Sequence, residues 1–187
     1  MSGSQFDLAL FVLRVAFGAS IAYHGYNKVS RGLKGTTSWF ASIGMRQPKM
    51  QARLAASTEL IVGALLCLGL FSEFASAGLI ALMIVAITVA HRKNGYFIFK
   101  SGQGWEYCAA IAVVGFVLGL TGPGNWSLDD NFGRVAIGST SDSTSGLTSG
   151  LTTGAFVLGL GLVSSAMQLA IFWRPNSLNK KSSKPNS

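Results

Sequence analysis

The stretch LAASTELIVGALLCLGLFSEFASAGLIALMIVAITVAH, residues 54–91, decides the fold of this chain. It holds two apolar runs, 54–71 and 74–91, which are separated only by Ser72 and Glu73. Each run is close to the ~20 residues that cross the ~30 Å hydrocarbon core of a bilayer as a helix. Because two residues leave room only for a tight turn, we expect an antiparallel pair of membrane-spanning helices.

Three more apolar runs flank this pair, at 8–26, 105–121 and 154–173. A cleaved signal peptide is the alternative for the first run, but that run lacks a basic start and contains Arg14. Only 12% of the residues are charged, about half of what soluble domains carry. The sequence therefore predicts an all-α integral membrane helix bundle with five spans, and it excludes a soluble or disordered chain.

The basic residues are unevenly distributed between the predicted loops. Thirteen of the fifteen Lys and Arg residues fall between the first and second spans, between the third and fourth, or after the fifth. By the positive-inside rule, we expect the amino terminus outside and the carboxyl terminus in the cytoplasm. Because topology accounts for the net charge of +8, the charge gives no reason to expect a nucleic-acid partner.

Two features between the spans are predicted from local composition. Residues 36–44 indicate a short helix in the cytoplasmic interface, with Trp39, Phe40 and Ile43 on one side, toward lipid or toward the bundle. Residues 138–154, nearly all Ser, Thr and Gly, indicate a flexible external linker. Small residues mark the faces on which the helices should pack closely: Gly18, Ala22 and Gly25; Ala52, Ala56 and Gly63; Gly154, Gly161 and Ser165.

Ionisable residues inside the spans are the strongest pointers to a site, because each is costly in lipid and normally faces a partner or a cavity. Counting about 1.5 Å per residue from Lys28 and Arg53 puts His24 and Glu59 near the same depth, where they should converge. Arg14 lies near the outer leaflet, where we expect it to snorkel toward Asp7, Glu73 or external water. His91 and Glu106 complete a predicted ring with His24 and Glu59 at the cytoplasmic edge.

Three interpretations of this ring remain open. His24 and Glu59 could form a buried pair that fixes helix register, or a quinone or proton site in which the imidazole exchanges protons near neutrality. The third is a metal or haem site with the two histidines as ligands, although no attachment motif supports it. Cys67 and Cys108 lie at different depths, which argues against a disulfide or a thiol relay.

Six motifs in order resemble the DoxX family of small bacterial membrane proteins. They are LRVAFGASIAYHG at 13–25, GTTSWFASIG at 35–44, the segment from Glu59 to Gly63, HRKNGY at 91–96, the segment from Trp105 to Tyr107, and GPGNWSLD at 122–129. The resemblance implies a four-helix core in the bacterial plasma membrane and an association with redox proteins. Some relatives are linked to thiosulfate oxidation with quinone, and others to membrane complexes containing superoxide dismutase and a sulfurtransferase.

The resemblance also implies site residues and a division of the chain. Matching positions are Arg14, His24, Gly25, Trp39, Glu59, His91, Asn94, Glu106 and Tyr107. We expect a core at 1–130, an external loop at 131–153, a fifth span at 154–174 and a basic tail at 175–187. The fifth span and the tail extend past the family core.

The expected function is that of a membrane subunit or anchor of a redox or oxidative-stress complex. The candidate catalytic residues are His24, Glu59, His91 and Glu106, and Trp39, Asn94 and Tyr107 are candidates for contacting a quinone. The expected partners are the lipid bilayer and soluble redox proteins at the cytoplasmic face, without nucleic acid. No residue is assigned as a metal ligand, and metal or haem content stays open. Enzymatic activity and homo-oligomerisation stay open. The rival is a non-catalytic scaffold whose polar residues only fix packing; a small transporter finds little support, because no inverted repeat is visible.

Overall fold

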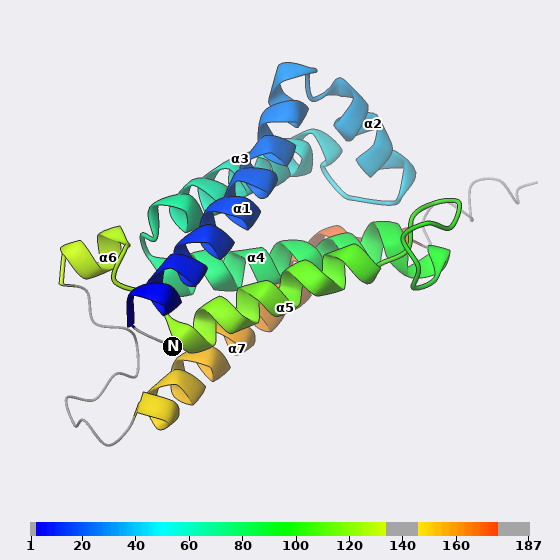
Figure 1. Cartoon of the computed structure of the whole chain (residues 1–187). Helices are drawn as coiled ribbons and strands as arrows, with labels where there is room; N and C mark the ends of the chain where they lie inside the picture. The colour runs from blue at the N-terminus through cyan, green and yellow to red at the C-terminus, as the bar shows by residue number, and fades with distance from the viewer. Residues whose placement is uncertain (1–2, 134–145, 176–187) are drawn as a thin grey trace, which may run out of the picture.

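The computed structural model describes residues 3–133 and 146–175. Its helices are α1 (Gly3–Ser30), α2 (Lys34–Ser42), α3 (Pro48–Leu68), α4 (Ser72–Ala86), α5 (Glu106–Thr121), α6 (Leu128–Asn131) and α7 (Gly146–Phe172). A π-helical turn η1 (Ile87–His91) and a 3₁₀ turn η2 (Arg92–Asn94) continue α4 without a break. The long helices run side by side along the molecule, and α2 and α6 lie at opposite ends (Figure 1).

The predicted fold class, an all-α membrane helix bundle, is confirmed. Within residues 3–133 and 146–175, four helices are long and apolar enough to cross a membrane: Gly3–Ser30, Pro48–Leu68, Ser72–Asn94 and Thr148–Phe172. The remaining predicted span, at 105–121, corresponds to α5, which is apolar but shorter. The predicted short helix between the first two spans is α2.

The last long helix begins earlier than the composition indicated. Residues 146–153, expected to be part of a flexible linker, form the first turns of α7. Their hydroxyls hydrogen-bond back into the helix, Thr152 Oγ1 to Thr148 O at 2.9 Å and Thr153 Oγ1 to Ser149 O at 3.0 Å. Gly154 packs directly against Leu120 of α5, so tertiary contact offsets a poor helix propensity. The rest of the predicted linker and nearly all of the predicted basic tail lie outside the described residues.

The helices form two groups. The first pairs α1 with α3, and the second combines α4, α5 and α7, with far fewer contacts from α1 to α5 (Figure 1). A Cβ atom added to Gly18 would lie 2.7 Å from Gly63 O, and one added to Gly25 would lie 2.7 Å from Ala56 O. The small-residue faces predicted for these two helices are therefore confirmed as the place where their backbones meet.

The helix α7 belongs to the bundle and holds α2 in place. Gln168 Nε2 donates to Gln51 Oε1 at 3.2 Å. At the end of α7, Trp173 Nε1 donates to Ile43 O at 2.9 Å, and the backbones of Arg46 and Phe172 are joined by a 2.7 Å hydrogen bond. The residues that follow α2 are thereby fixed to the end of α7, with the side chain of Phe40 buried beneath α2.

Arg14 corrects one prediction, because it does not snorkel to the surface. Its side chain is only 1% exposed, and it donates to Leu66 O at 3.3 Å and to Trp126 O at 2.6 Å. Leu66 is in the last turn of α3, where carbonyl groups lack helical partners and the helix dipole favours a cation. Two nitrogens of the guanidinium therefore donate to carbonyl groups inside the protein, whereas its Nε is buried without a hydrogen-bond partner among the described residues.

Asp129 is the counterpart of Arg14 at the start of the next helix. Its two carboxylate oxygens accept from Phe71 N at 2.9 Å and from Ser72 N at 2.8 Å. These amides belong to the free N-terminus of α4, where a carboxylate is stabilised. The turn between α3 and α4 is thus held by one buried cation and one buried anion, both supplied by other segments of the chain.

Candidate functional site

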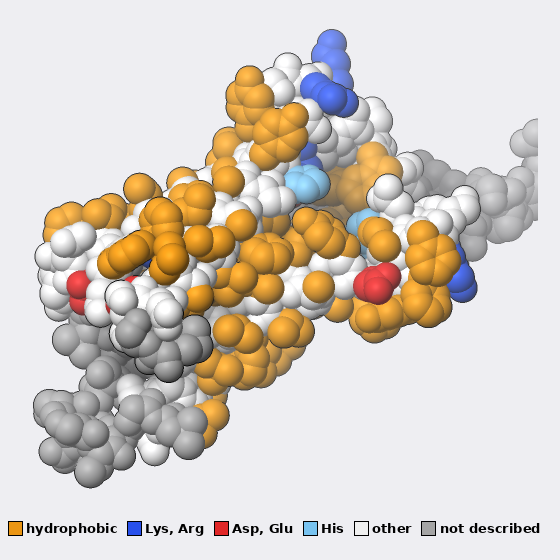
Figure 2. All heavy atoms as spheres, viewed as in Figure 1, with side chains coloured by type: hydrophobic (Ala, Val, Ile, Leu, Met, Phe, Trp, Pro, Cys, Tyr) orange, Lys and Arg blue, Asp and Glu red, His pale blue; other side chains and the backbone are white. Residues whose placement is uncertain are grey.

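A cavity of about 300 Å³ opens between the two helix groups, at the end of the bundle away from α6. Most of its lining is apolar and includes Ile21, Phe40, Leu82, Met83, Val89 and Ile111. The polar and aromatic lining consists of His24, Lys28, Trp39, Glu59, His91, Gln103 and Tyr107. Figure 2 shows histidine side chains (pale blue) around a hollow in the surface, and we call this space the histidine cavity.

The structure brings together most of the residues predicted for the site. His24 from α1, Trp39 from α2, Glu59 from α3, His91 from η1 and Tyr107 from α5 all line the histidine cavity. Asn94 and Glu106 lie beside it, outside the lining. The π-helical turn η1 is itself a local feature that is frequent at functional sites, and Val89, Ala90 and His91 of this turn contribute to the wall.

Glu59 is paired with Lys28. The Lys28 ammonium donates to both carboxylate oxygens of Glu59, and the side chains are 25% and 15% exposed. The expectation that His24 would be its partner is wrong, since no hydrogen bond joins the two among the described residues. His24 is one helical turn before Lys28 on the same face of α1. The longer lysine side chain reaches the carboxylate, and His24 is left exposed on the cavity wall.

This arrangement predicts which residues are energetically coupled. In a double-mutant cycle, Lys28→Met and Glu59→Gln should couple by about 1–2 kcal/mol, because the pair is half-buried and joins two helices. The matched cycle of His24→Ala with Glu59→Gln should be additive within about 0.5 kcal/mol. The free energy of unfolding in lipid bicelles, measured by steric trapping, gives both values. Stronger coupling in the His24 cycle would contradict the geometry.

His91 and Asn94 fasten the 95–104 loop to the end of α4. His91 Nδ1 lies 2.8 Å from Gln103 O, and because a carbonyl only accepts, Nδ1 carries the proton. Nε2 of the neutral ring is therefore the atom that remains to accept a proton. Asn94 Nδ2 donates to Ala90 O at 3.2 Å and also to Gly102 O. Asn94 therefore contributes to the cavity indirectly, by holding the loop that forms part of its wall.

Glu106 has a similar supporting position at the start of α5. Its Oε2 accepts from Ile98 N at 3.2 Å. Ile98, Gln103 and Gly104 of the same loop line the histidine cavity. Glu106 therefore shapes the wall of the cavity through the loop backbone, and the catalytic role predicted for it stays a prediction.

Lys28 and Gln103 are polar residues of this site that the sequence did not single out, and Lys28 is the more important because it pairs with Glu59. It was interpreted only as a basic residue marking the membrane edge. The available signal was its spacing of four residues from His24, which places both on one face of a helix. Within residues 3–133 and 146–175, no three His, Cys, Asp or Glu side chains form a group that could hold a metal ion.

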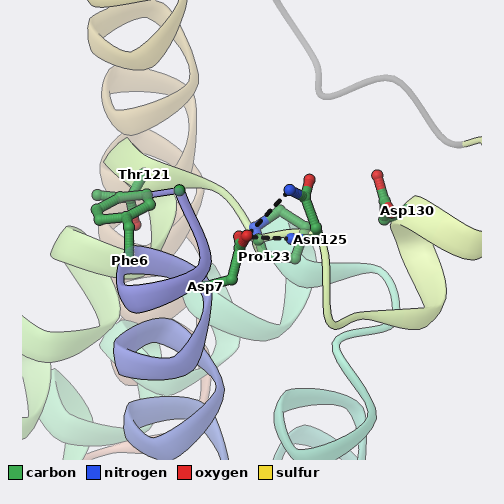
Figure 3. A pocket seen from close by; sticks show the side chains of 8 residues that line it. Phe6, Asp7, Thr121, Pro123, Asn125 and Asp130 are labelled. Atoms are coloured by element: carbon green, nitrogen blue, oxygen red, sulfur yellow. Dashed lines mark hydrogen bonds between the residues drawn. The ribbon is translucent and has the colours of Figure 1, made fainter. Parts of the chain in front are cut away.

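A second pocket, of about 390 Å³, lies at the opposite end of the bundle. Figure 3 shows Asp7 at its centre, with its carboxylate directed at Asn125. Asp7 accepts from Asn125 N at 2.9 Å and from Asn125 Nδ2 at 3.0 Å. Both carboxylate oxygens are therefore engaged in fixing the segment before α6 to the start of α1, which is a structural task.

The apolar helices and the histidine cavity define the class of this molecule: a multi-pass α-helical membrane protein with an amphipathic cavity at one end. Residues 9–92 match the family model described as DoxX, so this part of the chain is similar to DoxX family proteins. The matched stretch contains four of the predicted residues that line the cavity: His24, Trp39, Glu59 and His91. Tyr107 and α7 lie beyond it. No curated protein and no solved structure matches the chain.

Proposed function

We propose that this protein is the membrane subunit or anchor of a redox complex in the bacterial plasma membrane, and that the histidine cavity binds a quinone head group. The observation that carries the proposal is the composition of the cavity wall. It combines apolar side chains from α1, α4 and α5 with hydrogen-bonding side chains from α1, α2, α3, η1, α5 and the loop before α5. Such a wall suits a flat, mostly apolar ring whose orientation is set by a few polar contacts.

The polar groups of the cavity match the chemistry of a quinone. A bound quinone supplies two carbonyl oxygens that accept hydrogen bonds, and it takes up two electrons and two protons on reduction. His24 and Tyr107 lie on different helices and can donate to such oxygens. His91, whose Nδ1 donates to Gln103 O, has Nε2 left to accept a hydrogen bond from a reduced quinone. The Lys28–Glu59 pair keeps α1 and α3 in register beside these groups.

The charge distribution supports an orientation for the proposal. Basic residues gather at the end of the bundle that holds the cavity: Lys28, Arg31, Lys34, Arg46, Lys49, Arg53, Arg92, Lys93, Lys100 and Arg174. The acidic residues Asp7, Glu73 and Asp129 are at the other end. Under the positive-inside rule the cavity then faces the cytoplasmic leaflet, with the amino terminus outside and the carboxyl terminus inside. The basic face is available to acidic soluble redox partners.

Quinone binding is tested directly with the purified protein. A short-chain ubiquinone analogue should quench tryptophan fluorescence saturably, because Trp39 lines the cavity. Tyr107→Phe should weaken binding about fivefold, the effect of losing one hydrogen bond worth about 1 kcal/mol. Tyr26→Phe is the matched control, since Tyr26 is an exposed tyrosine of α1 outside the cavity, and it should bind as the unmodified protein does. Absence of saturable quenching in the unmodified protein would refute the quinone site.

The second candidate function is a non-catalytic membrane scaffold. The observation in its favour is the Lys28–Glu59 pair, because an ion pair between neighbouring helices accounts for Glu59 by packing alone. The two functions differ in what the membrane-extracted protein carries. Quinone recovered by solvent extraction, together with a redox difference spectrum, supports the redox subunit. A cofactor-free protein that still retains soluble partners in native membranes supports the scaffold.

A further inference from the structure

The helix α5 is too short to cross the bilayer alone. It has 16 residues, which at about 1.5 Å per residue span about 24 Å of the ~30 Å hydrocarbon core. Its antiparallel neighbour runs from Ser72 to Asn94, 23 residues, or about 34 Å by the same rise. The contacts of His91 with Gln103 and of Asn94 with Gly102 fold the 95–104 loop back along the end of this neighbour. The loop therefore occupies the depth that α5 leaves unfilled.

Part of the backbone of this loop is paired within the loop and with the start of α5. Gly104 N donates to Phe97 O at 3.1 Å, Trp105 N to Gly95 O at 3.2 Å and Glu106 N to Tyr96 O at 2.9 Å. Lys100 N and Gln103 N also donate inside the loop, and Ile98 N donates to the Glu106 carboxylate. Pairing of this kind lowers the cost of placing irregular backbone at membrane depth.

The side chains of the loop face outward and are apolar at its tip. Phe97, Ile98 and Phe99 are all exposed, and Phe99 is 79% exposed, the highest value among the large hydrophobic residues described. The rings of Phe97 and Phe99 stack at 5.2 Å, and the Lys100 ammonium lies 5.6 Å from the Phe97 ring centroid. Arg92 and Lys93 are exposed just before the loop. Aromatic side chains bordered by cations are typical of a segment at the boundary between lipid tails and headgroups.

We propose that the 95–104 loop is inserted into the bilayer, with Phe97 and Phe99 among the lipid acyl chains and Arg92, Lys93 and Lys100 at the headgroup phosphates. The partner of this surface is phospholipid, because exposed aromatics alone would equally suit a protein, whereas the depth left by α5 and the cations that border the aromatic rings point to lipid. Ile98, Gln103 and Gly104 line the histidine cavity, so the loop separates the cavity from lipid. This inference does not depend on what the cavity binds.

Site-directed spin labelling in phospholipid nanodiscs tests the insertion. A nitroxide on Phe99→Cys should collide more with oxygen, which concentrates in lipid, than with a water-soluble nickel chelate. Val163→Cys, on the exposed face of α7, is the lipid reference, and Lys34→Cys, exposed at the start of α2, is the water reference. The unmodified protein supplies the background, since Cys67 is half-buried and Cys108 is buried.

The expected result is an oxygen-to-nickel ratio at Phe99 nearer to that of Val163 than to that of Lys34. Phe97→Cys should behave in the same way and serves as a second position if the first variant folds poorly, which gel filtration would reveal. A ratio that matches Lys34 at both positions would overturn the proposal and would indicate a water-facing surface for a protein partner. Quinone titration of the same samples is scored separately, so failure of one proposal leaves the other intact.

Discussion

Replacing Gly63 with valine should separate α1 from α3 and strongly destabilise the protein. A Cβ atom at this position would lie 2.5 Å from both Ala22 N and Gly18 O. These are backbone atoms of the facing helix, so no side-chain rotation can make room. The expected cost is about 3 kcal/mol, at the upper end of what overpacking produces. This should lower the Tm in detergent by about 6–12 °C, measured by circular dichroism.

Gly159→Val is the matched control for this prediction. Gly159 is also a helical glycine in a membrane-spanning segment, but a Cβ atom there meets nothing within 4 Å. Valine has a better helix propensity than glycine, so the Tm should stay the same or rise slightly. If both variants lowered the Tm equally, the loss would come from valine in a transmembrane helix, and the close contact of α1 with α3 would not be its cause.

Arg14→Met should be the other severe change. Methionine keeps the length and apolar stem of the side chain but removes the side-chain donor to Trp126 O and one of the two donors to Leu66 O, which also accepts from Gly69 N. Asp129, whose charge interacts with Arg14, would also lose its buried counterion. Removing one partner of a buried charge system typically costs about 3–5 kcal/mol. We expect a Tm lowered by about 10 °C and faster proteolysis near residues 122–133, because Arg14 fixes that segment to α3.

Two variants distinguish this role from a general effect of charge. Arg31→Met removes an equal charge from an exposed position and should leave the Tm within about 2 °C. Arg14→Lys keeps the charge but cannot present two donors in the fork geometry of a guanidinium, so it should fall between the unmodified protein and Arg14→Met. Full stability of Arg14→Met would show that the two carbonyl groups are satisfied in another way.

The candidate site was predictable in part, because the depth of a residue in the membrane can be counted along its helix. Counting residues from the charged ends of two helices correctly placed His24 and Glu59 on one cavity, because the rise per residue is constant along a helix. Counting says nothing about which of two neighbouring side chains is long enough to reach across. Lys28, one turn further on, takes the carboxylate. The supporting positions of Asn94 and Glu106 depend on the path of a loop that has no periodicity.

The sequence by itself determined that the chain lies in a lipid bilayer and where most of its long helices are. The length and composition of each apolar run are properties of that run alone, so the all-α membrane fold and the close faces at Gly18 and Gly63 follow without knowledge of the rest. The burial of Arg14, the ion pair at the cavity and the folded loop before α5 were decided only by tertiary structure. Each joins atoms from different segments, as far apart as Arg14 and Trp126, and such contacts depend on how the two helix groups cross.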